Sequence, residues 1–141
     1  MDRITEDIFI GHKDDAVNVP LLQAAGIDAV LNVAIDLDIC PAHDGLPFTY
    51  CKVGMIDGEG NFRSTLLAAV RMLRQLIKWE HTILVHCMAG ISRSPTVVSL
   101  YLNRYDGVTL SYAFDYVLEH RPVADIHEAL IELARSLEKV H

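Results

Sequence analysis

Short apolar segments alternate with amphipathic stretches along this chain, and this alternation constrains the fold more than any other feature of the sequence. Apolar runs of strand length occupy residues 8–10, 29–33, 48–53 and 82–85. Between the last two runs, apolar residues recur every three or four positions from Phe62 to Ile77, which is typical of one face of a helix. Strands that alternate with helices favour an α/β fold. We therefore predict a central, mostly parallel sheet of four to five strands with helices on both faces.

Turn-forming residues divide the rest of the chain into further helices and loops. A helix capped by Asp14 or Asp15 is expected to run to Ala25 and to end at Gly26. Prolines or glycines mark two segments as loops, 34–47 and 54–61. Three more helices are expected, at 94–104, from 110 up to Pro122, and at 126–140.

Composition and charge limit the class of protein. The 141 residues are 51% hydrophobic, which is enough for one core, and we expect a single domain over residues 1–141. The formal net charge is −7 and no run of Lys or Arg occurs, which argues against nucleic acid as a partner. The first residues lack an apolar signal segment, and polar residues interrupt the apolar stretch 21–39. We therefore expect no membrane partner and a cytoplasmic location.

The three cysteines are Cys40, Cys51 and Cys87. This odd, low count does not make a disulfide framework and fits a reducing compartment. Cys40 and Cys51 are expected to be inert, and the alternative for either is a resolving thiol that caps an oxidised Cys87.

The segment from His86 to Ser94 carries the most specific chemical signal. It follows a predicted strand and opens a predicted helix, a place where several backbone N–H groups converge and bind a phosphate dianion. Arg93 adds a planar fork that can bind two phosphate oxygens. Gly90 lets the loop turn without a Cβ clash. The same positive environment favours the thiolate of Cys87, which is the nucleophilic form of cysteine.

Two other interpretations of this segment are weaker. His86 and Cys87 are potential metal ligands, but adjacent strand residues point to opposite faces, and no second Cys/His pair has ligand spacing. We therefore expect no metal and no cofactor. Cys87 as an inert cysteine at a strand end is the alternative to a nucleophile, and the complete motif argues against it.

These residues resemble the signature of the protein tyrosine phosphatase superfamily, His-Cys-x5-Arg-Ser/Thr. The sequence Ala-Gly-Ile-Ser-Arg-Ser at 89–94 is similar to the corresponding segment of the dual-specificity phosphatases, and the small size resembles that of their atypical, stand-alone members. The resemblance extends to the opening region, at Asn18, Leu22, 26–27 and 30–33, and to Arg121–Pro122. The chain departs from many members after Arg121–Pro122, where they carry an Asn-Pro-like step and this chain reads Val123-Ala124-Asp125-Ile126-His127.

The resemblance implies a role for each residue of the segment. The phosphate-binding residues would be Met88, Ala89, Gly90, Ile91, Ser92 and Arg93. Ser94 would ease the loss of the thiolate in the second chemical step, and it also suits a helix start. His86 would order the loop rather than transfer protons. Asn32 would brace the loop, although an Asn at a strand end equally often bonds its own backbone.

A carboxylic acid on a separate loop is needed to protonate the leaving oxygen of a phosphate ester. The glycine-rich loop upstream of Cys87 offers Asp57 and Glu59. We favour Asp57 because Asp is the residue of the family in that region and because it directly follows a predicted strand. Its flanking glycines would let the loop move over substrate. Ordinary turn chemistry is the alternative role for an Asp beside Gly.

The predicted function is hydrolysis of phosphomonoesters through a phosphocysteine intermediate, with phosphorylated protein as the substrate. Segment 34–47 is short, so we expect a shallow site that accepts phosphotyrosine and also phosphoserine or phosphothreonine. One alternative is a non-protein substrate: a phosphoinositide, an RNA end or a glycan. Others are a non-catalytic phosphate-binding module and a rhodanese-like sulfurtransferase. The uncharged residues within the loop, the acidic balance and the presence of Cys87, Arg93 and Asp57 together favour a catalytic protein phosphatase.

Overall fold

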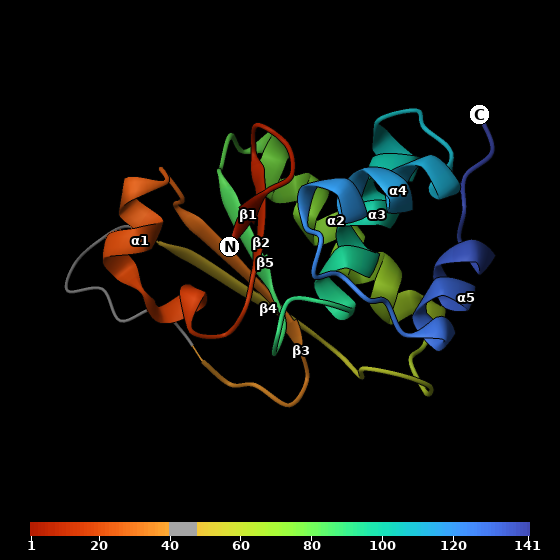
Figure 1. The fold of residues 1–141 in the computed structure, drawn as a ribbon, viewed down its shortest axis with the longest axis horizontal. Helices are drawn as coiled ribbons and strands as arrows, with labels where there is room; N and C mark the ends of the chain where they lie inside the picture. Colours follow the sequence, from red (N-terminus) through yellow and green to blue (C-terminus); the bar gives the residue numbers. More distant parts are fainter. Residues whose placement is uncertain (40–47) are drawn as a thin grey trace.

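The computed structural model describes residues 1–39 and 48–141, and its centre is one five-stranded sheet (Figure 1). The strands are β1 (Asp2–Arg3), β2 (Ile8–Gly11), β3 (Ala29–Ala34), β4 (Thr49–Met55) and β5 (Ile83–His86). Their order across the sheet is β1-β2-β5-β3-β4. β1 is antiparallel to β2, and the other neighbouring strands are parallel. The predicted α/β fold with a mostly parallel sheet is confirmed.

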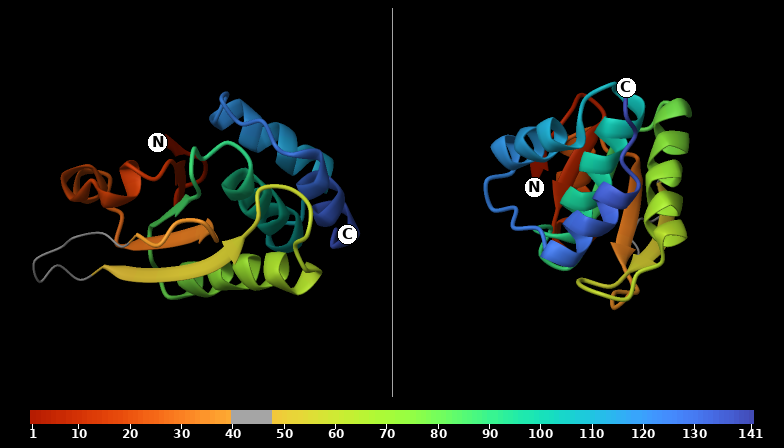
Figure 2. Two further views of the ribbon diagram at one scale, coloured as in Figure 1. Left: turned by 90° about the horizontal axis from the view of Figure 1, so that it is seen from below. Right: turned by 90° about the vertical axis from the view of Figure 1, so that its right-hand side faces the viewer.

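Helices cover both faces of this sheet. They are α1 (Val19–Ala24), α2 (Arg63–Lys78), α3 (Arg93–Tyr105), α4 (Leu110–His120) and α5 (Glu128–Ser136), with a 3-10 helix, η1, at Asp15–Val17. Figures 1 and 2 show α1 on one face and α2 to α5 on the other. Within residues 1–39 and 48–141, no helix combines the length and apolar character needed to cross a bilayer.

The strand residues divide between two apolar clusters because successive side chains point to opposite faces of a sheet. Val30 and Leu84 pack with Leu22 in the smaller cluster, under α1. Leu31 and Val85, one position along in each strand, belong to the larger cluster, which includes the buried faces of α2 to α5. The sheet is therefore buried on both faces, and its functional groups are confined to its ends.

α1 begins at Val19 rather than near Asp15, which corrects the sequence-based expectation. Pro20 has no backbone N–H and cannot continue a helix that started at Asp15. The chain instead forms η1 and then starts again, with Leu21 N donating to Asn18 Oδ1 at 3.2 Å and Pro20 in the first turn. Gly26 ends the segment as expected, with φ at 74°.

Parallel strands place their carboxyl ends at one edge of the sheet. β2, β3, β4 and β5 end there at Gly11, Ala34, Met55 and His86. The segments that leave these strands therefore gather at this edge, where ligands of α/β folds bind. The predicted nucleophile, arginine and acid all lie in or beside these segments.

Candidate active site

The loop at residues 87–92, called here the Cys87 loop, joins β5 to α3 at the carboxyl edge of the sheet. β5 lies between β2 and β3, so the loop emerges from the middle of the sheet. Cys87 is only 3% exposed, whereas Met88 and Ala89 are exposed. Gly90 has φ at 71°, and a Cβ there would run into the carbonyl of Gly11. Glycine is therefore required at this turn.

Arg93 is buried at the start of α3 and is held on one edge only. Its Nη1 donates to Asp36 Oδ1 at 2.5 Å and to the Met55 carbonyl at 3.0 Å. Its Nε is buried and has no hydrogen-bond partner among the described residues. A buried N–H without a partner is costly, so this edge of the guanidinium suits an anion that would satisfy it.

Asp36 is a site residue that sequence reasoning missed. It follows the end of β3, and its hydrogen bond from Arg93 holds the pKa of the carboxyl below its ordinary value. Asp36 is therefore ionised at neutral pH and fixes the direction of the Arg93 side chain. A carboxylate just after a strand at the carboxyl edge was the available sequence signal.

Asn32 supports the segment that carries Asp36. Its Nδ2 donates to the Leu37 carbonyl at 2.9 Å and to Tyr50 Oη at 3.2 Å, while its Oδ1 accepts from Ala34 N at 2.8 Å. Among the described residues, none of its hydrogen bonds reaches the Cys87 loop. The bracing role that the resemblance implies for Asn32 therefore stays a prediction.

Arg121 holds the Cys87 loop from the other side. It is buried, and its Nε donates to the Gly90 carbonyl at 2.6 Å while its Nη2 donates to the Ala89 carbonyl at 3.2 Å. Its Nη1 pairs with Asp2 at 2.7 Å. Because the loop carbonyls turn towards Arg121, it helps to fix the orientation of the loop peptides. The sequence singled out this arginine only through a resemblance.

Replacing Arg121 with alanine is expected to lower the free energy of unfolding by about 2–4 kcal/mol, because two loop carbonyls lose their donor. Urea denaturation followed by circular dichroism measures this change. Arg135→Ala removes an exposed arginine of α5 and is the matched control. We expect it to change stability by less than about 0.5 kcal/mol. Equal stability losses in the two variants would contradict the role given to Arg121.

The segment between α4 and α5 fixes the remaining side of the loop. Asp125 N donates to the Ile91 carbonyl at 2.7 Å, and His127 N donates to Ser92 Oγ at 2.9 Å. Thr96 Oγ1 donates to the Ser92 carbonyl at 2.8 Å, so α3 also contributes. These contacts leave the Cys87 loop bonded on several sides before any ligand arrives, which is the preorganisation that anion binding needs.

His86 and Ser94 flank the loop and are both buried. His86 Nδ1 lies 3.1 Å from the Cys87 carbonyl, and burial lowers the pKa of this histidine. The imidazole is therefore neutral at pH 7, which suits a structural role. Ser94 Oγ lies in the first turn of α3 and has no hydrogen-bond partner within the described part of the chain. Its hydroxyl therefore has an unused hydrogen-bond donor.

Asp57 and Glu59 both lie exposed on the loop between β4 and α2, which Figure 2 shows arching from β4 towards α5. Asp57 is two residues from Met55, whose carbonyl binds Arg93. Asn61 closes the loop, because its Oδ1 accepts from Ile56 N at 2.8 Å and its Nδ2 donates to the Ile56 carbonyl at 2.7 Å. Sequence reasoning missed Asn61 as the residue that shapes this loop.

No described contact joins Cys51 to Cys87. Cys51 is a half-buried free thiol on β4, and burial raises its pKa. It is therefore mostly protonated and less reactive at neutral pH. Cys40 lies outside the described residues.

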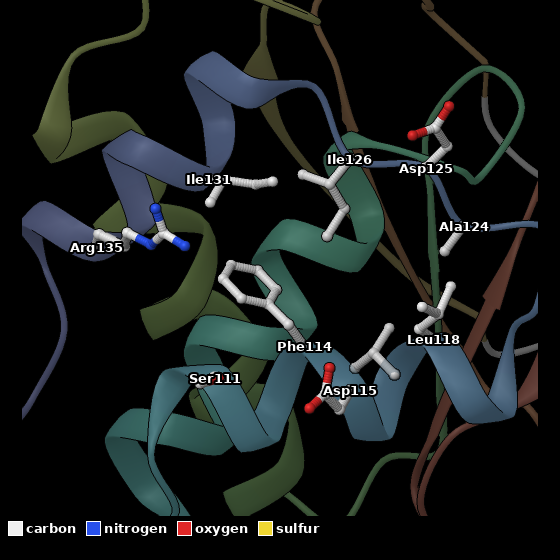
Figure 3. Close-up of a pocket in the computed structure, with 10 residues that line it drawn as sticks. Ser111, Phe114, Asp115, Leu118, Ala124, Asp125, Ile126, Ile131 and Arg135 are labelled. Carbon is white, nitrogen blue, oxygen red and sulfur yellow. The ribbon is translucent and has the colours of Figure 1, made fainter.

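A pocket of about 350 Å³ lies beside the site rather than in it, between α4, residues 124–126 and α5 (Figure 3). Phe114, Ile126 and Ile131 give it an apolar lining, and no residue of the Cys87 loop contributes. It adjoins the loop through Asp125, which binds Ile91. Because the convergent polar groups lie at the sheet edge, that edge and not this pocket is the candidate active site.

Comparison with known proteins gives a consistent match. A family described as "Dual specificity phosphatase, catalytic domain" matches residues 8–136. Dual specificity protein phosphatase 14 of Mus musculus is 34% identical over 122 residues, which cover 86% of this chain and 60% of the relative. Dual specificity protein phosphatase 1 of Arabidopsis thaliana is 32% identical over 137 residues, which cover 96% of this chain and 68% of the relative.

A solved structure is similar across the whole described fold. It is a mouse putative dual specificity phosphatase complexed with zinc tungstate, 27% identical, with a TM-score of 0.86. The alignment covers 97% of this chain and 85% of that one. The chain thus spans 60% of the length of the mouse sequence relative, while it matches most of the solved mouse chain.

Proposed function

The chain belongs to the dual specificity phosphatase family, and we propose that it is a cysteine-dependent phosphomonoester hydrolase acting on phosphorylated proteins. The observation that carries this proposal is that only some of the hydrogen-bond donors of the Arg93 guanidinium have partners. One edge of its guanidinium binds Asp36 and Met55, and its Nε is buried without a partner at the start of the helix that the Cys87 loop opens. A phosphate in the loop would satisfy this edge and would sit over Cys87.

The first chemical step transfers the phosphoryl group to the enzyme. The Cys87 thiolate attacks phosphorus, an S–P bond forms, and the bond to the ester oxygen breaks. Asp57 protonates that oxygen as it leaves. Arg93 and the loop N–H groups stabilise the charge spread over the three equatorial oxygens.

The second step releases phosphate and restores the thiolate. Water attacks the phosphocysteine, Asp57 accepts a proton from it, and the S–P bond breaks. Ser94 donates a hydrogen bond to the departing sulfur, a role supported by its buried hydroxyl, which has no partner among the described residues. His86 stays neutral and orders the loop.

The tungstate complex of the mouse relative supports an anion site in this fold. Tungstate is a tetrahedral oxyanion with the shape of phosphate. We infer that the Cys87 loop of this chain binds such anions, because its peptides and Arg93 are already held by Arg121, Asp125 and Asp36. The residues of the loop between Cys87 and Arg93 are uncharged, which favours protein substrates over phosphoinositides.

A side-by-side assay tests the substrate class. We expect hydrolysis of matched phosphotyrosine and phosphothreonine peptides, with phosphotyrosine preferred because a phenoxide leaves more easily. Phosphoinositides and RNA 5′ ends should react far more slowly. A kcat/KM ratio above about 10⁴ for phosphotyrosine over phosphothreonine would contradict dual specificity, since one or two poor contacts do not give such a factor. Faster turnover of a phosphoinositide or RNA end would contradict a protein substrate.

Replacing Asp57 with asparagine is expected to lower kcat by roughly 10²–10⁴-fold, the usual contribution of a general acid. The loss should shrink for aryl phosphates with good leaving groups, because these need less protonation. Steady-state kinetics with a series of aryl phosphates measures both effects.

Glu59→Gln is the matched control for Asp57→Asn, since it removes a carboxylate from the same loop. We expect it to keep kcat within about threefold, which is typical of a residue outside the chemistry. If Glu59→Gln causes the loss and Asp57→Asn does not, the general acid is Glu59.

We also propose that residues 1–141 form one catalytic domain in the cytoplasm. One sheet with its two apolar clusters accounts for the described residues, and the family match spans 8–136. A reducing compartment would keep Cys87 and Cys51 as the free thiols seen here.

A further inference from the structure

Four described segments surround the Cys87 loop and form what we call the mouth, namely 12–15, 35–38, 56–61 and 121–127. Each is placed by a hydrogen bond. Lys13 N donates to the Met88 carbonyl at 3.0 Å, and Asp125 N donates to the Ile91 carbonyl at 2.7 Å. Arg93 binds Asp36 and the carbonyl of Met55, which directly precedes 56–61. A chain whose phosphate enters the loop must therefore pass over these segments.

Carboxylates dominate the exposed charge of the mouth. Apart from Asp36, which binds Arg93, the exposed acidic residues are Asp14, Asp38, Asp57, Glu59 and Asp125. Their side chains make no hydrogen bond or ion pair with any other described residue. Figure 3 shows Asp125 beside the loop that leads into α3, with its carboxylate directed away from Phe114 and Ile126.

Few cations offset these carboxylates. Lys13 is exposed, whereas Arg121 is buried and committed to Asp2 and the loop carbonyls. Two further cations lie near these segments and keep their charge, but they are fewer than the carboxylates: Lys52 Nζ donates to the Leu37 carbonyl at 2.6 Å, and Arg63 Nη2 donates to the Ser136 carbonyl at 2.9 Å. His12 and His127 each accept a backbone N–H at Nδ1, and His12 Nε2 lies 3.7 Å from Asp15 Oδ2.

The mouth differs from an ordinary acidic surface because a buried arginine, Arg93, lies at its centre. The buried guanidinium of Arg93, with its unpartnered Nε, marks the point at which an anion enters, and the carboxylates surround that point. Arg93 thus neutralises a bound phosphate, while the substrate residues on either side of that phosphate face the carboxylates of the mouth.

We propose that the mouth selects phosphorylated residues flanked by lysine or arginine and disfavours those flanked by carboxylates or by a second phosphate. This inference rests on the proposed phosphatase function and names the substrate class of the same site. Exposed charge pairs are individually weak, but several acting together give about a tenfold preference at low ionic strength. The specificity residues are Asp14, Asp38 and Asp125, since Asp57 and Glu59 lie on the loop that supplies the general acid.

Two phosphotyrosine peptides of equal length test the proposal, one with lysines and one with glutamates beside the phosphotyrosine. We expect wild-type kcat/KM to favour the lysine peptide about tenfold at about 0.02 M salt and less than about threefold at about 0.5 M salt. The ratio is the readout because it cancels changes in the chemical step that both peptides share. Equal values for the two peptides, or a preference for the glutamate peptide, would overturn the inference.

The double variant Asp38→Asn/Asp125→Asn should reduce the ratio to about threefold or less. Glu6→Gln/Glu80→Gln removes the same net charge near the amino ends of β2 and β5 and should leave the ratio unchanged. An equal fall in both variants would show that net charge, and not the mouth, selects the substrate, and would overturn the inference.

An aryl phosphate with no charged group besides the phosphate distinguishes failure of the proposed charge preference from failure of the proposed phosphatase function. If it is hydrolysed and the peptides show no preference, the inference fails and the proposed function stands. If wild-type protein hydrolyses neither the aryl phosphate nor the peptides, the proposed function fails and the inference fails with it.

Discussion

Replacing Cys87 with serine is expected to lower kcat by at least about 10⁴-fold while leaving phosphate binding nearly intact. A serine hydroxyl is almost un-ionised near pH 7 and is a far weaker nucleophile than a thiolate. The loop itself should keep its shape, because Arg121, Asp125 and His127 bond its other residues. Turnover of an aryl phosphate and calorimetric titration with tungstate measure the two properties separately.

Cys51→Ser is the matched control for this experiment. Cys51 lies on β4, half-buried, with a pKa raised by burial, so it should not contribute to the chemistry. We expect its kcat to stay within about twofold of the wild type. A Cys87→Ser protein that retained a tenth or more of wild-type kcat would rule out a cysteine nucleophile.

Replacing Arg93 with lysine should lower kcat/KM by roughly 10³-fold or more. An ammonium group cannot at once hold Asp36 and the Met55 carbonyl and present a second N–H edge to the phosphate. The loss should therefore appear in the affinity for phosphate and tungstate as well as in kcat. Because Arg93 is buried, thermal unfolding of the variant must be recorded beside the kinetics.

Arg104→Lys provides the comparison within the same helix. Arg104 lies at the far end of α3, where its Nη1 donates to the Leu137 carbonyl at 2.7 Å. We expect a small change in stability and unchanged kcat/KM. If Arg93→Lys binds tungstate as tightly as the wild type does, Arg93 is not the phosphate clamp.

The sequence was sufficient to predict the class of fold but not the order of its strands. Apolar runs indicated β2 to β5, because β3 and β5 are buried throughout and the edge strand β4 is mostly half-buried. β1 was not predicted, since Asp2–Arg3 is short and polar and is defined only by its pairing with β2. The position of β5 between β2 and β3 depends on contacts between distant segments, which local patterns do not encode.

The residues of the candidate site also differ in whether local sequence could predict them. Cys87 and Arg93 lie within one contiguous motif, and their spacing was enough to suggest their roles. Asp36 and Arg121 meet that motif from 57 and 31 residues away, at Arg93 and Gly90 respectively, so only the folded chain reveals them. Asn61 acts within its own loop, and an Asn that ends a glycine-rich stretch was a signal that sequence reasoning did not use.

The central claim is that phosphate passes through Cys87, and rapid-quench mass spectrometry tests it most directly. Protein mixed with an aryl phosphate for less than one turnover is quenched and digested, and the peptide that contains Cys87 is analysed. Ser94→Ala, which should slow the second step, is treated in parallel to raise the amount of intermediate. We predict phosphate on Cys87, formed together with a burst of the phenol that approaches one per active site. Release of phenol without phosphate on Cys87, or with phosphate on another residue, would contradict the account.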